Sequence, residues 1–176
     1  MASLRIDMRR NSSVLAAALI FAAISLLLLA YAPNSAEEID AVVVPERVVD
    51  GDTLWVHSIY GFKVNQTFKV RLADIDTPER GEPGFYEAKA ELNALVSRVP
   101  CILLAVDSPP YGRYGRVIAV VYIPASDGRL LNVNYLLVQK GLARYVDYPG
   151  SFHPEDFSPE IPIPTRYASI LNTYCT

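Results

Sequence analysis

The period of the apolar positions changes along the chain, and each change indicates a different element. Residues 14–32 contain no charged side chain and are mostly Ala, Leu and Ile. Beyond them, residues 42–49, 53–57 and 67–72 are short stretches rich in β-branched and aromatic side chains, as is typical of strands. Because little sequence separates these three stretches, we expect them to form an antiparallel meander. Pro45 lacks an N–H group, so we expect the start of the first strand at a sheet edge.

The pattern then becomes helical over residues 85–98. This spacing places five apolar side chains on one helix face: Phe85, Ala88, Leu92, Leu95 and Val96. Two further apolar runs, at residues 101–106 and 116–123, predict strands. A second helix is expected over about residues 132–140, with Gly141 just after its end.

Five strands, with one helix after the third and another after the fifth, predict an α+β, mainly β domain. The expected architecture is a five-stranded Greek-key OB-fold barrel with two to three helices, preceded by an N-terminal hydrophobic helix. We divide the chain into an anchor or signal segment with a linker (1–35), the barrel domain (36–148) and a Pro-rich C-terminal tail (149–176). Residues 166–174 could add a last short helix.

The N-terminal apolar run has two interpretations. Its 19 residues would span about 28 Å as a helix, enough to cross the hydrocarbon core of a bilayer. Ala30-Tyr31-Ala32 also fits the cleavage pattern of a secretory signal peptide. Three arginines in the first ten residues favour a cytoplasmic N-terminus in either case. We therefore expect an extracytoplasmic domain, either membrane-anchored by the N-terminal helix or secreted.

Charge and cysteine content constrain the expected partners. Without residues 1–32, the chain keeps 13 basic and 18 acidic residues, a net charge of −5. Such a domain would hold a polyanion through a few local cations and a metal ion rather than through bulk charge. The two cysteines, Cys101 and Cys175, either form a disulfide that ties the tail to the barrel or remain separate thiols.

The chemistry open to this sequence is limited. It contains no G-x-S-x-G elbow, P-loop, G-x-G-x-x-G motif or paired Cys/His zinc pattern. What remains is carboxylates, arginines and a hard cation. Asp52 and Asp76 lie near the ends of neighbouring expected strands, and two carboxylates with a backbone carbonyl and waters suit Ca²⁺ or Mg²⁺.

The remaining candidates would act on a phosphodiester. Arg71 and Arg116 carry guanidinium forks that match its oxygens and its transition-state charge. Glu79 could deprotonate or orient a water molecule. Asp74, on the same strand face as Asp76, is either an outer-shell partner of this site or exposed, and we favour the exposed position. Each motif alone has an ordinary explanation, since Asp-Gly is a common turn and Thr-Pro-Glu a common helix start.

Together, four sequence blocks resemble the staphylococcal nuclease (thermonuclease) family over residues 40–148. The blocks are Val48–Thr53, Arg71–Glu79, Tyr114-Gly115-Arg116 and Leu137–Ala143. The resemblance implies an OB-fold barrel that cleaves DNA and RNA with Ca²⁺, and Mg²⁺ is the less favoured ion. The long C-terminal helix of the family has no clear counterpart in this sequence.

The resemblance also implies roles for individual residues. Asp52 and Asp76 correspond to metal carboxylates, and Thr77 to the residue that offers its carbonyl. Arg71 and Arg116 correspond to the catalytic arginines, and Glu79 to the proposed general base. Tyr114 matches a position beside the nucleotide. The tandem Tyr-Gly-Arg repeat makes Arg113 a phosphate-steering candidate.

The expected function is therefore a Ca²⁺-dependent nuclease that acts on DNA and/or RNA outside the cytoplasm. We expect membrane contact through the N-terminal segment, no obligate protein partner and a monomer. The alternative is a non-catalytic, membrane-tethered OB module that binds nucleic acid or protein. Such a module has no need for Glu79 together with both arginines and both aspartates, and this favours the enzyme.

Overall fold

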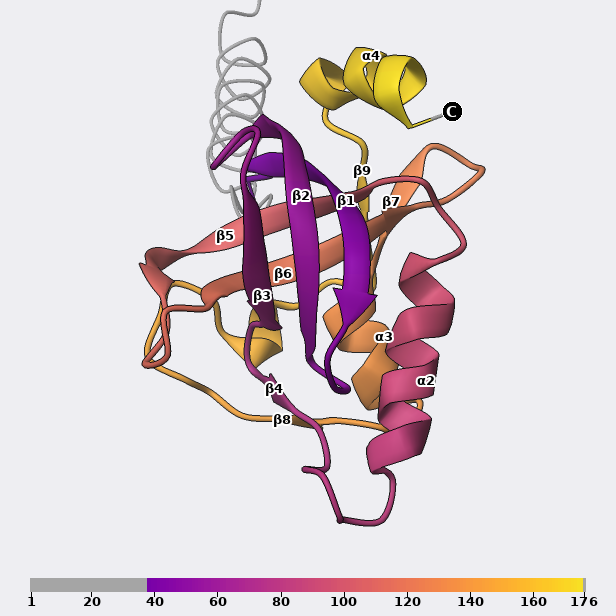
Figure 1. Cartoon of the computed structure of the whole chain (residues 1–176). Helices are drawn as coiled ribbons and strands as arrows, with labels where there is room; N and C mark the ends of the chain where they lie inside the picture. The colour runs from indigo at the N-terminus through magenta and orange to yellow at the C-terminus, as the bar shows by residue number, and fades with distance from the viewer. Residues whose placement is uncertain (1–37, 176) are drawn as a thin grey trace, which may run out of the picture. The chain divides into compact units, whose positions relative to one another are not determined.

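The computed structural model describes residues 38–175, and these residues form a mainly β fold with three α-helices (Figure 1). The strands, in chain order, are β1 (Ala41–Val48), β2 (Thr53–Gly61), β3 (Thr67–Leu72), β4 (Ile75–Asp76), β5 (Ile102–Tyr111), β6 (Val117–Pro124), β7 (Arg129–Asn132), β8 (Arg144–Tyr145) and β9 (Glu160–Pro162). The helices are α2 (Phe85–Val96), α3 (Val133–Gln139) and α4 (Thr165–Tyr174), with a 3₁₀ turn, η1 (Pro154–Asp156). The expected N-terminal hydrophobic helix lies outside the described residues.

Five of these strands close into a ring. The antiparallel pairings β3–β2, β2–β1, β1–β5 and β5–β6 form a continuous sheet, and a parallel pairing between β3 and β6 closes it. Strands β7 and β9 continue the sheet beyond β6. The closed ring is consistent with the predicted OB-like barrel. Its interior is apolar, with Leu54, Val56 and Val70 fully buried.

The first strand corrects one expectation. Residues Ala41–Val43 pair with β2 on one side and with β5 on the other, so the start of β1 lies inside the sheet. Pro45 instead lies at a register shift, in the half of the strand that pairs only with β2. A residue without an N–H group is tolerated there because one side of the strand has no neighbour.

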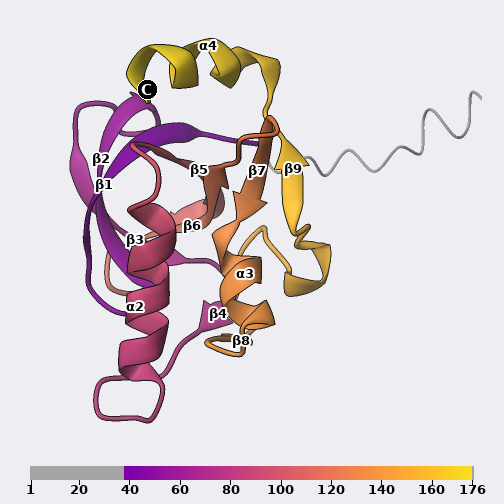
Figure 2. The same cartoon turned by 90° about the vertical axis from the view of Figure 1, so that its right-hand side faces the viewer.

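The two expected helices form where the periodicity placed them (Figure 2). All five apolar residues assigned to one face of α2 are buried. Asn132 caps α3 by accepting a hydrogen bond from the backbone N–H of Tyr135 at 3.0 Å. Gly141 follows with a φ of 69°, the left-handed conformation expected after a helix end. Between residues 38 and 175, no helix has the length and hydropathy needed to cross a bilayer.

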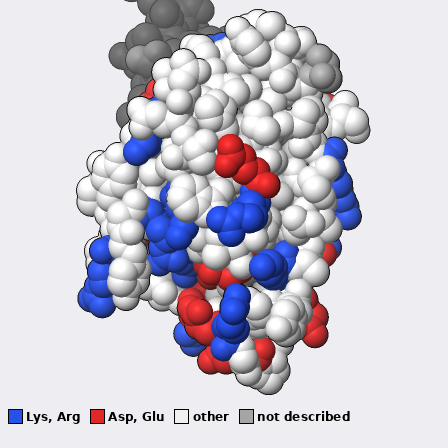
Figure 3. Space-filling model, in the orientation of Figure 1, with Lys and Arg blue, Asp and Glu red and all other residues white. Residues whose placement is uncertain are grey.

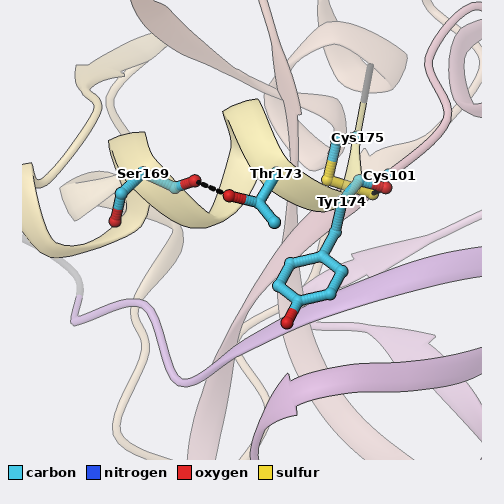
Figure 4. Close-up of a disulfide and its surroundings, with 5 residues drawn as sticks. All are labelled: Cys101, Ser169, Thr173, Tyr174 and Cys175. Atoms are coloured by element: carbon cyan, nitrogen blue, oxygen red, sulfur yellow. Dashed lines mark hydrogen bonds between the residues drawn. A yellow bond between two sulfur atoms is a disulfide. The ribbon is translucent and has the colours of Figure 1, made fainter.

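The C-terminal segment is part of the folded core. Strand β9 pairs with β7, and Phe157, Ile161, Tyr167 and Leu171 join a buried cluster with barrel residues. Cys101 and Cys175 form a disulfide with a Cα–Cα distance of 5.3 Å, which fixes the end of α4 beside the start of β5 (Figure 4). The two alternatives left open by the sequence are thereby decided in favour of the bridge.

Candidate functional site

The turn between β1 and β2 positions the central carboxylate of the site. Asp52 follows Gly51, where an added Cβ would come within 2.7 Å of the Ala88 Cβ and 2.8 Å of the Thr77 Cβ. Only glycine therefore allows the turn to pack this closely against α2 and the segment after β4. The close approach brings the side chain of Asp52 against Thr77, 25 residues later in the chain.

Asp52 is buried and fully hydrogen-bonded. Its Oδ2 accepts hydrogen bonds from the Thr77 hydroxyl at 2.8 Å and the Thr77 backbone N–H at 3.1 Å. Its Oδ1 accepts from the Thr53 hydroxyl at 3.1 Å and lies 3.2 Å from Arg71 Nε. Burial raises the pKa of Asp52, against the lowering effects of Arg71 and Thr77. The raised pKa shows that desolvation of this carboxylate outweighs the stabilisation of its charge by the protein alone.

Arg71 joins the two carboxylates that the sequence proposed as metal ligands. Besides its contact with Asp52, its guanidinium donates to the Leu72 carbonyl at 3.0 Å and to Asp76 Oδ1 at 3.4 Å. Strand pairing explains the placement, because Arg71 lies opposite Thr53 in the β2–β3 register. Asp52 and Asp76 are thus brought together through Arg71, as the sequence predicted, although Asp76 lies in β4 and pairs with β8 instead of ending the third strand.

Arg144, which the sequence analysis did not single out, completes the charge network. It donates to Asp76 Oδ2 from Nη2 at 2.7 Å and from Nε at 3.2 Å. The antiparallel pairing of Asp76 with Arg144 in β4 and β8 produces this contact. The position of Arg144 directly after the Leu137–Ala143 block was a signal available in the sequence. Nothing in the local sequence, however, showed that β8 would pair with β4.

The second catalytic candidate approaches from β6. Arg116 donates from Nη1 to the Thr53 hydroxyl at 3.2 Å, and its guanidinium lies 5.5 Å from the centroid of the Tyr114 ring. Arg113 and Tyr114 are exposed. These three residues line one pocket of about 580 Å³ together with Arg71 and Tyr148. The pocket thus collects both predicted arginines and both predicted substrate-binding residues.

Glu79 lies apart from this network. It is exposed, its backbone N–H donates to Glu82 at 2.7 Å, and its side chain makes no hydrogen bond or ion pair with the other described residues. The structure therefore brings together Asp52, Arg71, Asp76, Thr77 and Arg116 in one network, with Glu79 outside it.

Asp74 corrects a second expectation. It was expected to be exposed, but it is 4% exposed and has a φ of 51°. Its Oδ1 accepts a hydrogen bond from the Tyr148 backbone N–H at 3.0 Å, whereas Oδ2 has no partner among the described residues. Burial, with a contribution from nearby Asp107, raises its pKa to about 6. The left-handed backbone turns Asp74 inward, and strand alternation cannot foresee such a turn.

The donor set fits a hard divalent cation. Asp52, Asp76 and the carbonyl of Thr77 supply oxygen donors, the type that Ca²⁺ and Mg²⁺ prefer. Within residues 38–175, no three His, Cys, Asp or Glu side chains gather closely enough to hold a metal. The remaining donors would therefore be neutral oxygens, including water. A bound cation would compete with the guanidinium groups of Arg71 and Arg144 for the oxygens of Asp76.

The fold and this site define a class of protein: an OB-like barrel with carboxylates and arginines converging at one edge. Comparison with known proteins identifies the family within this class. A family model described as staphylococcal nuclease homologue matches residues 69–158. The chain belongs to this family, and the predicted resemblance is confirmed.

Individual relatives agree with this assignment. Micrococcal nuclease of Shigella flexneri is 38% identical over 109 residues, which cover 59% of this chain and 58% of that protein. Protein ParB of Escherichia coli is 32% identical over 157 residues, covering 87% and 78% respectively. An uncharacterized endonuclease of Haemophilus influenzae is 34% identical over 97 residues, covering 55% and 48%. The chain thus spans little more than half of the Shigella protein and about half of the Haemophilus protein.

Proposed function

We propose that this protein is a Ca²⁺-dependent nuclease that hydrolyses phosphodiester bonds of DNA and/or RNA. The observation that carries the proposal is that Arg71 contacts both Asp52 and Asp76, while Arg71 and Arg116 line one pocket. Family membership and relatives that are named as nucleases support it. Mg²⁺ is the second choice of ion.

The proposed division of labour follows from the contacts. Arg71 and Arg116 would bind the non-bridging oxygens of the phosphate and stabilise the charge that grows in the transition state. Asp52 and Asp76, with the Thr77 carbonyl, would hold the cation. When bound, Ca²⁺ would polarise the phosphoryl oxygen and position a water molecule. Glu79 would accept the proton of that water, and this requires its exposed side chain to turn towards the pocket.

We also propose that the domain acts outside the cytoplasm, as an anchored or secreted monomer. The Cys101–Cys175 disulfide supports this location, because such bonds persist in oxidising compartments. The apolar run at residues 14–32 supports delivery across a membrane or attachment to it.

The test is cleavage of single-stranded DNA and RNA by the full chain in mild detergent, with Ca²⁺, with Mg²⁺ or with chelator. The matched control is Arg116→Ala, which removes one part-buried hydrogen bond, to Thr53, and the contact with the Tyr114 ring. We expect Ca²⁺-dependent cutting that falls about 10²- to 10³-fold in the variant. A folded, Ca²⁺-binding protein that cuts neither substrate would refute the proposal.

One observation favours the alternative, a binding module without catalysis. The side chain of Glu79 is exposed and outside the network, and both oxygens of Asp76 already contact guanidinium groups. A binding module would hold the oligonucleotide without Ca²⁺ and leave it intact. The same experiment therefore separates the two functions.

A further inference from the structure

A row of side chains leads away from the site along the outer face of β2 and β3. In β2, Leu54 and Val56 point into the core and are 0% exposed, so Trp55 between them points outward. In β3, Lys69 points outward between the buried Phe68 and Val70. Trp55 lies directly opposite Lys69 in β3 and opposite Arg47 in β1. One tryptophan and two cations therefore share one rung of the sheet.

The two cations lie over the indole ring. Lys69 Nζ is 5.2 Å and Arg47 Cζ is 6.0 Å from the ring centroid. Such cation–π contacts are weak at a surface, about 0.5–1 kcal/mol, and both cations lie at the ends of flexible stems. A nearby phosphate could therefore draw either cation from the ring and leave a face of the indole free.

The row is continuous with the proposed catalytic site. The next rung on the same face of the β2–β3 ladder, two residues along, is Thr53 opposite Arg71, and Thr53 also accepts the hydrogen bond from Arg116. Successive outward residues in a strand are about 7 Å apart, so Trp55 lies one rung from the catalytic arginines. In the other direction the row ends at Thr67, whose hydroxyl donates to Glu46 at 3.2 Å.

The charge on this face is uneven. Lys and Arg side chains gather over its middle, where an acidic side chain lies among them, and further acidic side chains gather towards its lower end (Figure 3). The whole chain has a net charge of −3. A local basic and aromatic row on an acidic protein is selective for a polyanion with flat apolar groups.

We propose that Trp55, Arg47 and Lys69 form a binding subsite for single-stranded nucleic acid next to the cleaved bond. A base stacks on Trp55, and Arg47 and Lys69 bind the flanking phosphates. Stacking on an aromatic ring does not depend on base identity, so the subsite adds affinity without sequence preference. The inference rests on the proposed nuclease function and assigns the route of the strand beyond the reacting phosphate.

Trp55 is the only tryptophan of the chain, so its fluorescence reports on this subsite alone. The experiment titrates the full-length Arg116→Ala variant, in mild detergent with chelator, with an eight-residue oligothymidylate. We expect the oligonucleotide to quench Trp55 fluorescence, in parallel with the anisotropy of a labelled copy. Trp55→Leu, followed by anisotropy, should weaken binding roughly tenfold or more.

Two surface variants keep the test valid if Trp55→Leu folds poorly. Arg47→Ala and Lys69→Ala should each weaken binding and lower the slope of log affinity against log salt by about 0.7. Lys89→Ala on α2 is the matched control and should leave binding unchanged. Unquenched fluorescence at saturating oligonucleotide, or equal weakening by Lys89→Ala, would overturn the proposal.

Two other results have distinct meanings. Quenching by vesicles that contain phosphatidylglycerol, without quenching by the oligonucleotide, would assign the face to an anionic membrane and overturn the proposal. A wild-type protein that cuts DNA with Ca²⁺ but shows no quenching refutes this subsite and leaves the proposed function intact. A protein that is quenched and never cuts refutes the enzyme and supports the subsite.

Discussion

The two ends of the barrel are built on different principles. At one end, which we call the tail end, α4 lies across the barrel and is held by the Cys101–Cys175 disulfide and by buried Tyr167 and Leu171 (Figures 1 and 4). At the other, the site end, the β1–β2 turn and β4 bring together the charges of Asp52, Arg71 and Asp76. The tail end is closed by apolar burial and a covalent bond, the site end by charge pairs.

The tail end therefore supplies stability, and the site end carries the groups proposed for chemistry. Apolar burial and a disulfide stabilise the fold whether or not a ligand is present. The site end instead keeps buried carboxylates whose pKa values are raised by desolvation, as at Asp52 and Asp74. Desolvation of these groups makes the fold less stable, and at Asp52 it keeps a carboxylate where the proposed cation would bind. Changes at the two ends should therefore affect different measurements.

The largest expected effect comes from breaking the tail end. Cys101→Ala combined with Cys175→Ala opens a loop of 74 residues. In the chain-entropy relation, closing a loop of this length stabilises the folded state by about 4 kcal/mol. We expect the free energy of unfolding, measured in urea, to fall by about this amount. Because the disulfide lies at the tail end and the site residues lie at the site end, the cleavage rate of the folded variant at 25 °C should stay at the wild-type value.

Reduction of the wild-type protein with dithiothreitol serves as the control, since it opens the same bond without a substitution. It should lower stability to the same level as the double variant. A variant that remains folded but loses cleavage activity would show that the two ends are coupled, and the comparison would fail.

The tail end also marks the limit of the sequence as a guide. The inward positions of β2, such as Leu54 and Val56, and of α2, such as Leu92, were predictable. Each follows from a repeat of apolar residues that are close together in the sequence. The pairing of β9 with β7 and the burial of Tyr167 depend on partners far along the chain. No local pattern encodes those partners, so residues 149–176 were set apart from the barrel as a tail, although the possible short helix over residues 166–174 does form as α4.

The same limit explains the outcome at the site. Asp52 and Arg71 could be predicted to meet because β2 and β3 are consecutive and paired and the D-G-D turn is short, and Asp76 follows only four residues after the end of β3. The contact of Arg144 with Asp76 depends on a two-residue strand pair that spans 68 positions. The burial of Asp74 depends on one left-handed residue, a conformation that non-glycine residues seldom adopt.

The second prediction tests whether the site end lowers stability. The pKa of Asp74 is about 6 in the folded protein against a reference of 3.8, so the folded state binds its proton more tightly. Stability should therefore fall as pH rises from about 4 to 6, by up to about 3 kcal/mol for roughly two pKa units. Asp74→Asn removes the charge and should be more stable than wild type at pH 8, with little difference at pH 4.

Urea denaturation of wild type and variant across this pH range gives the measurement. The difference between the two curves isolates Asp74 from other carboxyls with raised pKa values, such as Asp40. Asp107→Asn is a useful companion, because Asp107 contributes to the raised pKa of Asp74 and its loss should lower that pKa. A stability difference that does not change between pH 4 and pH 8 would contradict the assignment.

The smallest expected effect concerns Arg144, which contacts Asp76 through two nitrogens yet has a side chain that is 78% exposed. A surface ion pair of this kind contributes little to stability, so Arg144→Ala should leave the urea midpoint nearly unchanged. It also frees an oxygen of Asp76 and removes a positive charge that would repel a cation. We therefore expect the variant to bind Ca²⁺ a few-fold more tightly in calorimetry without substrate.

Lys140→Ala, which breaks the exposed pair with Glu91 on α2, is the matched control and should not change Ca²⁺ affinity. If Arg144→Ala instead weakened Ca²⁺ binding, Arg144 would hold Asp76 in place for the metal rather than compete with it.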